Sequence, residues 1–333
     1  MRAAVVQGLH QPLIVETVAD PVPGAGEIVV KVGRCGICGS DLHMTEDPAY
    51  GVRAGDVLGH EFAGEIVALG QDTEGVGMGD LVSVIPLAGC GNCESCSKGE
   101  PAWCSGFALQ GGGYAEYAIT RPSQCVVLPR SASLADGALV EPLAVALHGV
   151  HMSGLKQGNN VLILGAGPIG MAVAFWAKRK GAAQVTVQDV ADFQRDRALA
   201  LGADHFITCP EDPIGSAERA AGGKADIVFE CVGIPGLIAQ AVEQVRARGT
   251  ILLLGLCTKP DTFISFAMLS KEVRLITSAF FTRSEFEMAL DALSAGASEP
   301  RSLITSTIDL DSTPSVFEAL RRRTDQCKVM IAP

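Results

Sequence analysis

The chain has 333 residues, of which 48% are hydrophobic, and its net charge is −11. This length exceeds one ordinary domain and predicts two domains with a good core each, while the acidic balance and the lack of a basic stripe exclude nucleic acid and anionic membranes as expected partners. No apolar run reaches membrane length and the first residues lack the apolar region of a signal peptide, so we expect a cytoplasmic protein.

From Met1 to about Arg130 the sequence consists of short runs that are apolar or alternate, broken by glycine and proline. Such runs cover residues 28–32, 65–69 and 81–85, and three glycines start another at 111–118. Short runs of this kind separated by turn residues predict a mostly antiparallel β domain.

Candidate metal ligands occur in three separate pieces of the first 141 residues. The pieces contain Cys38, the pair His60 and Glu61, and Glu141 before a proline. A thiolate, an imidazole and one or two carboxylates can hold a zinc ion and leave a position open for water or substrate. Cys35 and Cys38 also form a CxxC, which can be interpreted as a redox pair, but the βαβ context of such a motif is missing.

A stronger metal motif follows, with the spacing C-x2-C-x2-C-x7-C. It consists of Cys90, Cys93, Cys96 and Cys104, with glycine, asparagine and serine among the intervening residues. Four thiolates so close in sequence can wrap one tetrahedral zinc ion and stabilise a lobe that has little core of its own. An iron–sulfur cluster is the rival interpretation, although the proline that usually follows the last cysteine is absent.

The chain contains eleven cysteines, an odd number that argues against a pure disulfide framework. In a reducing compartment, cysteine clusters more often bind metal. The remaining single cysteines stand in apolar runs, and we expect them to be small core residues. They are Cys125, Cys209, Cys231, Cys257 and Cys327.

Helical periodicity begins at about Ala135 and continues to Gly154, where a helix could bridge the two domains. Strand-like and helix-like segments then alternate, the strands being expected at 161–164, 184–188, 226–231, 250–255 and 274–277. This rhythm predicts a doubly wound parallel sheet with crossover helices.

The first strand of that sheet leads into a glycine-rich turn and then a helix running to about Lys180. The turn contains Gly165, Gly167, Pro168, Ile169 and Gly170. Strand, glycine turn and helix in this order predict a dinucleotide site, with the pyrophosphate at the helix N-terminus. Asp189 ends the second strand, where a carboxylate accepts hydrogen bonds from a ribose 2′-OH and repels a 2′-phosphate, so NAD is favoured over NADP. A βαβ unit without a ligand is the alternative, and it leaves Asp189 unexplained.

The final segment contains helix-like runs at 285–295 and 313–323 and a strand-like run at 328–331. It is too short to form a domain and is expected to rejoin the first one. We therefore expect residues 1–141 and 278–333 to form the catalytic domain and residues 142–277 the NAD-binding domain.

Together these motifs resemble the zinc-containing medium-chain alcohol dehydrogenases, especially the branch with sorbitol, butanediol and threonine dehydrogenases. The resemblance covers essentially the whole chain in order. It is carried by residues 36–41, 59–61, the four-cysteine motif, 141–143, 165–170 and 229–233. It implies an α/β protein in which a GroES-like, mostly-β catalytic domain carries two zinc ions and a Rossmann domain carries NAD.

The resemblance also implies roles for single residues. Cys38 and His60 would be zinc ligands, and Asp41 would orient His60. Glu61 resembles the neighbouring carboxylate that ligates zinc in some members and swings in and out in others. Glu141 stands where other members have a third cysteine ligand, a departure that leaves direct ligation or ligation through water open. The resemblance further implies that Ser40 and His43 relay the alcohol proton, that Arg195 lies along the adenine and that the protein is a homodimer or homotetramer.

The expected reaction is the reversible oxidation of a secondary alcohol, diol or polyol to the ketone, with hydride transfer to NAD. A zinc-free quinone or enoyl reductase on the same fold would not need Cys38, His60 or the cysteine motif. A catalytically silent, zinc-stabilised protein that binds or senses NAD is the alternative outside the enzymes. The sequence does not name the substrate.

Overall fold

The computed structural model describes residues 1–208, 211–322 and 324–333. Contacts divide the chain into two compact units. The first contains Met1–Glu141, Thr282–Ala297 and Ile304–Pro333, and the second contains Pro142–Phe281 and Ser298–Leu303. Residues 278–281 and 298–303 thus group with the second unit, whereas the sequence assigned all of 278–333 to the first.

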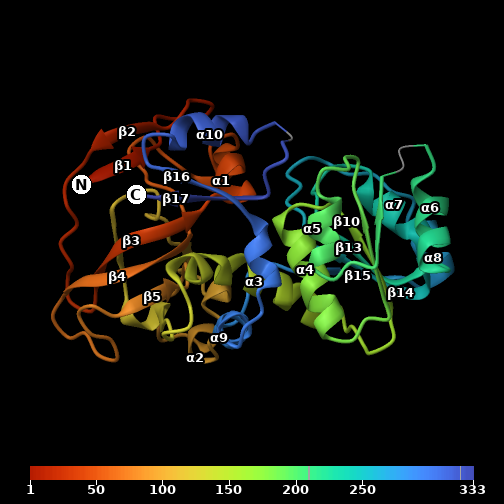
Figure 1. The fold of residues 1–333 in the computed structure, drawn as a ribbon, viewed down its shortest axis with the longest axis horizontal. Helices are drawn as coiled ribbons and strands as arrows, with labels where there is room; N and C mark the ends of the chain where they lie inside the picture. Colours follow the sequence, from red (N-terminus) through yellow and green to blue (C-terminus); the bar gives the residue numbers. More distant parts are fainter. Residues whose placement is uncertain (209–210, 323) are drawn as a thin grey trace. The chain divides into compact units, whose positions relative to one another are not determined.

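The first unit is built on a sheet with the strand order β16-β17-β3-β4-β5-β9, in which β3 also pairs with β8. These strands are β3 (Ile28–Gly36), β4 (Glu61–Leu69), β5 (Leu81–Val84), β8 (Tyr117–Thr120), β9 (Cys125–Val127), β16 (Ile304–Asp309) and β17 (Lys328–Ala332). Figure 1 labels β3, β4, β5, β16 and β17 of this sheet. Two small antiparallel pairs add β1 (Arg2–Val5) with β2 (Ile14–Thr17) and β6 (Leu87–Ala88) with β7 (Ala108–Leu109). Apart from the parallel pair β16 and β17, the described pairs of this unit are antiparallel, which confirms the expected β architecture.

Short helices connect these strands. They are α1 (Gly39–Met44), α2 (Glu94–Ser97), α9 (Arg283–Ser294), α10 (Thr313–Ala319) and the 3-10 turns Pro48–Tyr50, Pro101–Trp103 and Pro122–Gln124. Helix α9 starts with a capping box in which Thr282 accepts from the Glu285 backbone N–H and the Glu285 carboxylate accepts from the Thr282 N–H. Such reciprocal bonds satisfy two otherwise unpaired helix donors and fix where the helix begins.

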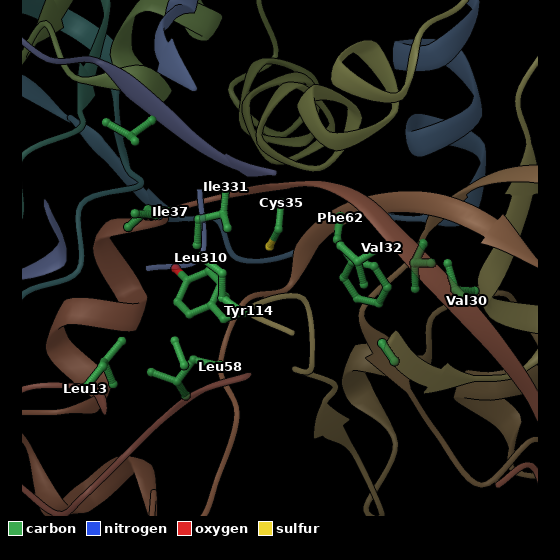
Figure 2. Close-up of a cluster of buried hydrophobic side chains, with 14 of the residues drawn as sticks. Leu13, Val30, Val32, Cys35, Ile37, Leu58, Phe62, Tyr114, Leu310 and Ile331 are labelled. Carbon is green, nitrogen blue, oxygen red and sulfur yellow. The ribbon is translucent and has the colours of Figure 1, made fainter. Parts of the chain in front are cut away.

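A continuous apolar core fills the first unit, and Figure 2 shows part of it. Alternate residues of β3, among them Val30 and Val32, point into this core, and Phe62 of β4 packs with them. The last strand contributes as well, because β17 pairs with β3 through Met330 opposite Gly36 and Ile331 opposite Cys35. The end of the chain therefore lies beside the strand that leads to Cys38.

The second unit contains a parallel sheet with the strand order β12-β11-β10-β13-β14-β15. Its strands are β10 (Asn160–Leu164), β11 (Gln184–Gln188), β12 (His205–Ile207), β13 (Ala225–Glu230), β14 (Val245–Leu253) and β15 (Arg274–Thr277). Its helices are α4 (Pro168–Arg179), α5 (Arg195–Ala200), α6 (Pro213–Ala221), α7 (Leu237–Gln244), α8 (Ser265–Lys271) and the 3-10 helix Glu299–Leu303, while α3 (Leu134–Met152) begins in the first unit and ends in the second. The crossover pattern confirms the Rossmann fold.

Some expected elements differ from the observed ones. The run 111–118 is a strand only from Tyr117, because Gly112 has a φ of +108° and the segment turns before β8 begins. Helix α10 ends at Ala319 rather than near Arg323, which lies outside the described residues, as does Cys209. Cys257 is exposed and is not the core residue we expected. Among the helices of the described ranges, none is both long and apolar enough to cross a membrane.

Candidate active site

The four cysteines of the C-x2-C-x2-C-x7-C motif converge in the first unit. The Sγ atoms of Cys90, Cys93, Cys96 and Cys104 lie within 4.8 Å of one another. Backbone N–H groups of Cys90 and Gly106 donate to the Cys104 Sγ at 3.4 and 3.3 Å, and these bonds lower the pKa of Cys104 to about 6. A closed set of four thiolates without an open position fits a structural zinc ion.

Glycines let the chain fold this tightly around the cysteines. Gly91 and Gly99 have φ values of +79° and +76°, which other residues rarely adopt. A Cβ atom at Gly89 would lie only 2.5 Å from the Sγ of Cys96. The spacing of the motif and its glycines thus produce the four-sulfur geometry locally.

A second group of donors joins residues that are distant in sequence. Ligand atoms of Cys38, His60 and Glu61 lie within 4.8 Å of one another. Cys38 precedes helix α1, and His60 and Glu61 stand where a loop enters strand β4. His60 and Glu61 are buried, while Cys38 is half-buried. Catalytic zinc sites typically have three protein ligands of these types, which leaves the fourth position of the ion open to water or substrate.

The buried side chain of Asp41 contacts His60 of this group. Its Oδ1 lies 3.2 Å from the Nδ1 of His60, a contact that favours the proton on Nδ1 and leaves Nε2 for a metal. Burial alone would lower the pKa of His60, but the charge of Asp41 and its hydrogen bond raise it well above the ordinary value. Burial alone would raise the pKa of Asp41, but the charge of His60 lowers it. The pair therefore fixes the ring in one orientation.

Lys328 is a residue of this site that the sequence analysis missed. Its Nζ donates to the Oε1 of Glu61 at 2.7 Å and to the carbonyl of Ile37 at 2.9 Å, and both charged side chains are almost fully buried. The other oxygen of Glu61, Oε2, is also buried and accepts no hydrogen bond from the described residues. A buried carboxylate oxygen without a donor fits a cation as its partner, so the donor set is compatible with zinc.

Glu141 is the fourth predicted ligand, and it lies outside the group of three donors. It is buried within helix α3, and desolvation raises its pKa to about 7, with the charge of His60 acting in the opposite direction. The structure therefore brings together three of the four predicted ligands of the scattered set.

Ser40 and His43 both lie on the short helix α1 that follows Cys38. They are three residues apart, a spacing that puts both on one face of a helix. Both are half-buried. Their predicted part in proton transfer stays a prediction.

In the second unit, the glycine turn joins β10 to α4 and is tightly packed at two of its glycines. Gly165 has a φ of +101°, and a Cβ there would lie 2.6 Å from the Cγ2 of Val232. A Cβ at Gly170 would lie 2.0 Å from the carbonyl oxygen of Gly165, so only glycine allows this close packing of helix on strand. Gly167, by contrast, faces open space. Gly167 is the N-cap of α4, where Pro168 and Ile169 begin the helix, and the predicted pyrophosphate at this helix N-terminus stays a prediction.

Asp189 lies directly beside this turn. Its Oδ2 accepts a hydrogen bond from the N–H of Ala166 at 2.7 Å, and its Oδ1 accepts one from Ala191 at 3.1 Å. These bonds hold the carboxylate at the carboxyl end of β11, the edge at which dinucleotides bind in such sheets.

Arg195 is engaged within its own surroundings. Its guanidinium pairs with Asp192, donates to the carbonyl of Phe206 at 2.8 Å and lies 5.1 Å from the centre of the Phe206 ring. These contacts hold the side chain on α5 and β12, and its predicted place along an adenine stays a prediction.

Comparison with known proteins identifies the family. Residues 24–130 match the alcohol dehydrogenase GroES-like domain, and residues 168–295 match the zinc-binding dehydrogenase family. The (R,R)-butanediol dehydrogenase of Bacillus subtilis is 31% identical over 96% of both chains. The chain belongs to the zinc-containing medium-chain alcohol dehydrogenases.

Similarity to other members assigns the chain to one branch of the family. The sorbitol dehydrogenase of Bacillus subtilis is 29% identical over 100% of this chain and 97% of its own length. The crystal structure of the alcohol dehydrogenase RspB from Escherichia coli CFT073, complexed with NADH, superposes with a TM-score of 0.91 at 29% identity, covering 100% of this chain and 99% of the other. This chain therefore falls in the sorbitol and butanediol dehydrogenase-like branch of the family, as the motifs predicted.

The metal-ligand side chains of this protein agree with the zinc chemistry of the family. Zinc alcohol dehydrogenases that use NAD(P) act on CH–OH groups, and the two donor sets described above fit a structural and a catalytic zinc ion. Lys328 could have been suspected from the sequence, because a lysine that begins an apolar strand needs a partner if it is buried.

Proposed function

We propose that this protein oxidises a secondary alcohol, diol or polyol reversibly to the ketone, with hydride transfer to NAD. The observation that carries the proposal is the convergence of Cys38, His60 and Glu61, together with a buried oxygen of Glu61 that has no donor among the described residues. The names of the sorbitol and butanediol dehydrogenases among the relatives support a diol or polyol as substrate.

In this proposal Cys38, His60 and Glu61 hold the catalytic zinc. When bound, zinc supplies Lewis-acid activation of the alcohol, and NAD accepts the hydride. Asp41 keeps the Nε2 of His60 directed at the metal. Ser40 and then His43 carry the alcohol proton outward along α1. Glu141 acts through water, since it lies outside the three-donor group.

The structural zinc ion would be held by the four thiolates of the cysteine lobe. Four sulfur donors close the coordination shell, so this ion takes no part in the reaction. Its contribution would be to hold together a lobe that is otherwise made of one-turn helices and glycine turns.

The dinucleotide would bind at the glycine turn between β10 and α4. Its pyrophosphate fits the open space beside Gly167, and its ribose fits the carboxylate of Asp189. Arg195 would lie along the adenine while Asp192 and Phe206 hold its guanidinium.

Replacing Asp189 by alanine should weaken the preference for NAD over NADP. A hydrogen bond to a charged group contributes about 1.5–3 kcal/mol, so the ratio of kcat/KM for NAD to that for NADP should fall at least about tenfold. Initial rates with both dinucleotides measure this ratio. Asp196→Ala, which removes an exposed carboxylate on α5, is the matched control. Equal ratios in both variants and the wild type would move the ribose contact to another residue.

The experiment that tests the reaction is NADH formation with secondary alcohols, vicinal diols, sugar polyols and threonine, each with and without a zinc chelator. Chelator-sensitive turnover on one class would establish the reaction and its metal dependence together. Turnover that resists the chelator would favour a zinc-free reductase. NADH binding without turnover on any substrate would favour the silent NAD-binding protein instead.

We also propose that the protein is a homo-oligomer and that a second copy covers the apolar face of α8. Strand β15 ends the sheet and, within the described residues, pairs only with β14. Helix α8 packs on β14 and leaves apolar side chains exposed, since Ile264 at its N-cap, Phe266 and Leu269 are 76%, 69% and 72% exposed. An open strand edge and exposed apolar side chains in the same unit suit pairing with the same surface of a second chain.

Thiolate metal sites and free cysteines support a cytoplasmic location.

Replacing Phe266 by glutamate should shift the protein towards the monomer. A charge at the centre of an apolar contact must be desolvated without a partner, which costs several kcal/mol. Sedimentation velocity over a range of protein concentrations measures the shift. Leu199→Glu, on α5, is the control and should leave the sedimentation coefficient unchanged. If Phe266→Glu also leaves it unchanged, the second copy does not bind this face.

A further inference from the structure

Tyr114 is a fully buried residue to which the mechanism above gives no role. Figure 2 shows its ring in the core of the first unit, with Leu58, Leu310 and Ile331 in the same cluster. A tyrosine in such a place needs a partner for its hydroxyl, because an unpaired buried hydroxyl is costly. A phenylalanine would fill the same space without this requirement.

The hydroxyl of Tyr114 donates to the Oδ2 of Asp41 at 2.6 Å. The same oxygen accepts the backbone N–H of Cys38 at 3.1 Å, and the other oxygen faces the Nδ1 of His60 at 3.2 Å. Three donors thus hold one buried carboxylate. Two of them belong to proposed metal ligands, and the third is Tyr114.

The backbone of the glycine-led segment puts the ring in this position. Gly113 donates to the carbonyl of Gly59 at 2.9 Å, and Tyr114 donates to that of Leu58 at 3.0 Å. A Cβ at Gly59, which has a φ of +89°, would lie 2.3 Å from the Cδ1 of Tyr114. The ring therefore packs against the residue directly before His60, so Tyr114 contacts the His60 loop by its ring and Asp41 by its hydroxyl.

We propose that Tyr114 is a positioning residue of the catalytic metal site, whose hydroxyl fixes the carboxylate of Asp41 and thereby orients His60 and Cys38 toward the ion. Without the hydroxyl, the N–H of Cys38 is the one donor that the described residues leave to the Oδ2 of Asp41, and the carboxylate can rotate away from His60. This inference rests on the proposed zinc site of Cys38, His60 and Glu61. Substituting a residue that holds a metal ligand in place typically lowers metal affinity by about 10- to 100-fold.

Tyr114→Phe tests the proposal, because it removes the hydroxyl and keeps the ring. We expect zinc affinity at the catalytic site to fall at least about tenfold, measured by competition with a chromophoric chelator. The absorption bands of the Co²⁺-substituted protein should shift as well, since they report the ligand geometry directly. Tyr117→Phe, the same change at a half-buried tyrosine of β8, should leave both readouts at the wild-type values. Loss of thermal stability alone, with unchanged zinc affinity and Co²⁺ bands, would overturn the proposal.

A double-mutant cycle with Asp41→Ala, which removes both carboxylate oxygens, tests whether Tyr114 acts through Asp41. When Tyr114→Phe is added to the Asp41→Ala variant, it should cause no further loss of zinc affinity. An equal loss in the variant and in the wild type would mean that Tyr114 acts on the site by another route and would overturn the proposed one. If the wild-type protein holds zinc in the cysteine lobe alone, the proposed catalytic zinc site is wrong. If it holds two zinc ions and Tyr114→Phe leaves the zinc affinity unchanged, only the proposal about Tyr114 is wrong.

Discussion

Replacing Cys38 by alanine should lower kcat/KM for alcohol oxidation by about a thousandfold or more and remove one of the two zinc ions that the donor sets predict. Cys38 is the only thiolate of the scattered donor group, and His60 and Glu61 alone make a poor site. The loss of several kcal/mol of charge stabilisation accounts for the fall in rate. Steady-state kinetics and metal analysis of the same preparation measure both effects.

Cys35→Ala is the matched control, since it makes the same substitution three residues earlier. Cys35 is fully buried beside Gly59 and Gly113, and burial raises the pKa of its thiol well above the ordinary value. It should keep both zinc ions and most of the turnover. Equal loss of activity in the two variants, with zinc retained in both, would contradict the zinc assignment and favour the interpretation of the CxxC as a redox pair.

The parts of the site that the sequence predicts well are those built from neighbouring residues. The four cysteines of the lobe lie within fifteen positions, so their spacing alone restricts them to one ion. The glycine turn is similar, because Gly165 has a φ of +101° and a Cβ at Gly170 would meet the carbonyl oxygen of Gly165, and both constraints lie within the strand, turn and helix. In both cases short-range geometry decides the structure, and the pattern can be read without knowing the fold.

The contacts that the sequence could not predict join distant segments. Lys328 meets Glu61 from 267 positions away, because β17 pairs with β3. Tyr114 meets Asp41 across 73 positions, because the glycine-led segment runs along residues 57–59 instead of forming a strand. The periodicity of an element says which face is buried but not which other element covers it. These side chains could be placed only when the sheet order was known.

Replacing Lys328 by methionine should destabilise the first unit by about 3–5 kcal/mol, because it leaves a buried carboxylate without its cation. Burial alone would lower the pKa of Lys328, but the charges of Glu61 and Cys38 raise it above its ordinary value, so the ammonium is charged at neutral pH and its pair with Glu61 is complete. This contribution persists below the ordinary lysine pKa of about 10.4 and is lost only as the pH rises through the raised value. Urea unfolding at neutral pH, followed by circular dichroism, measures the change.

Lys98→Met provides the comparison, because Lys98 pairs with Glu94 at the same 2.7 Å but both side chains are exposed. An exposed pair of this kind contributes about 0.3–0.5 kcal/mol, so the two variants should differ about tenfold in their effect on stability. The effect of Lys328→Met should also be largest in chelator-treated protein, because a bound zinc ion offers the carboxylate of Glu61 another cation. If chelator treatment makes no difference to Lys328→Met, Glu61 does not contact the metal, and the catalytic zinc must be held by Cys38 and His60 with a donor other than Glu61.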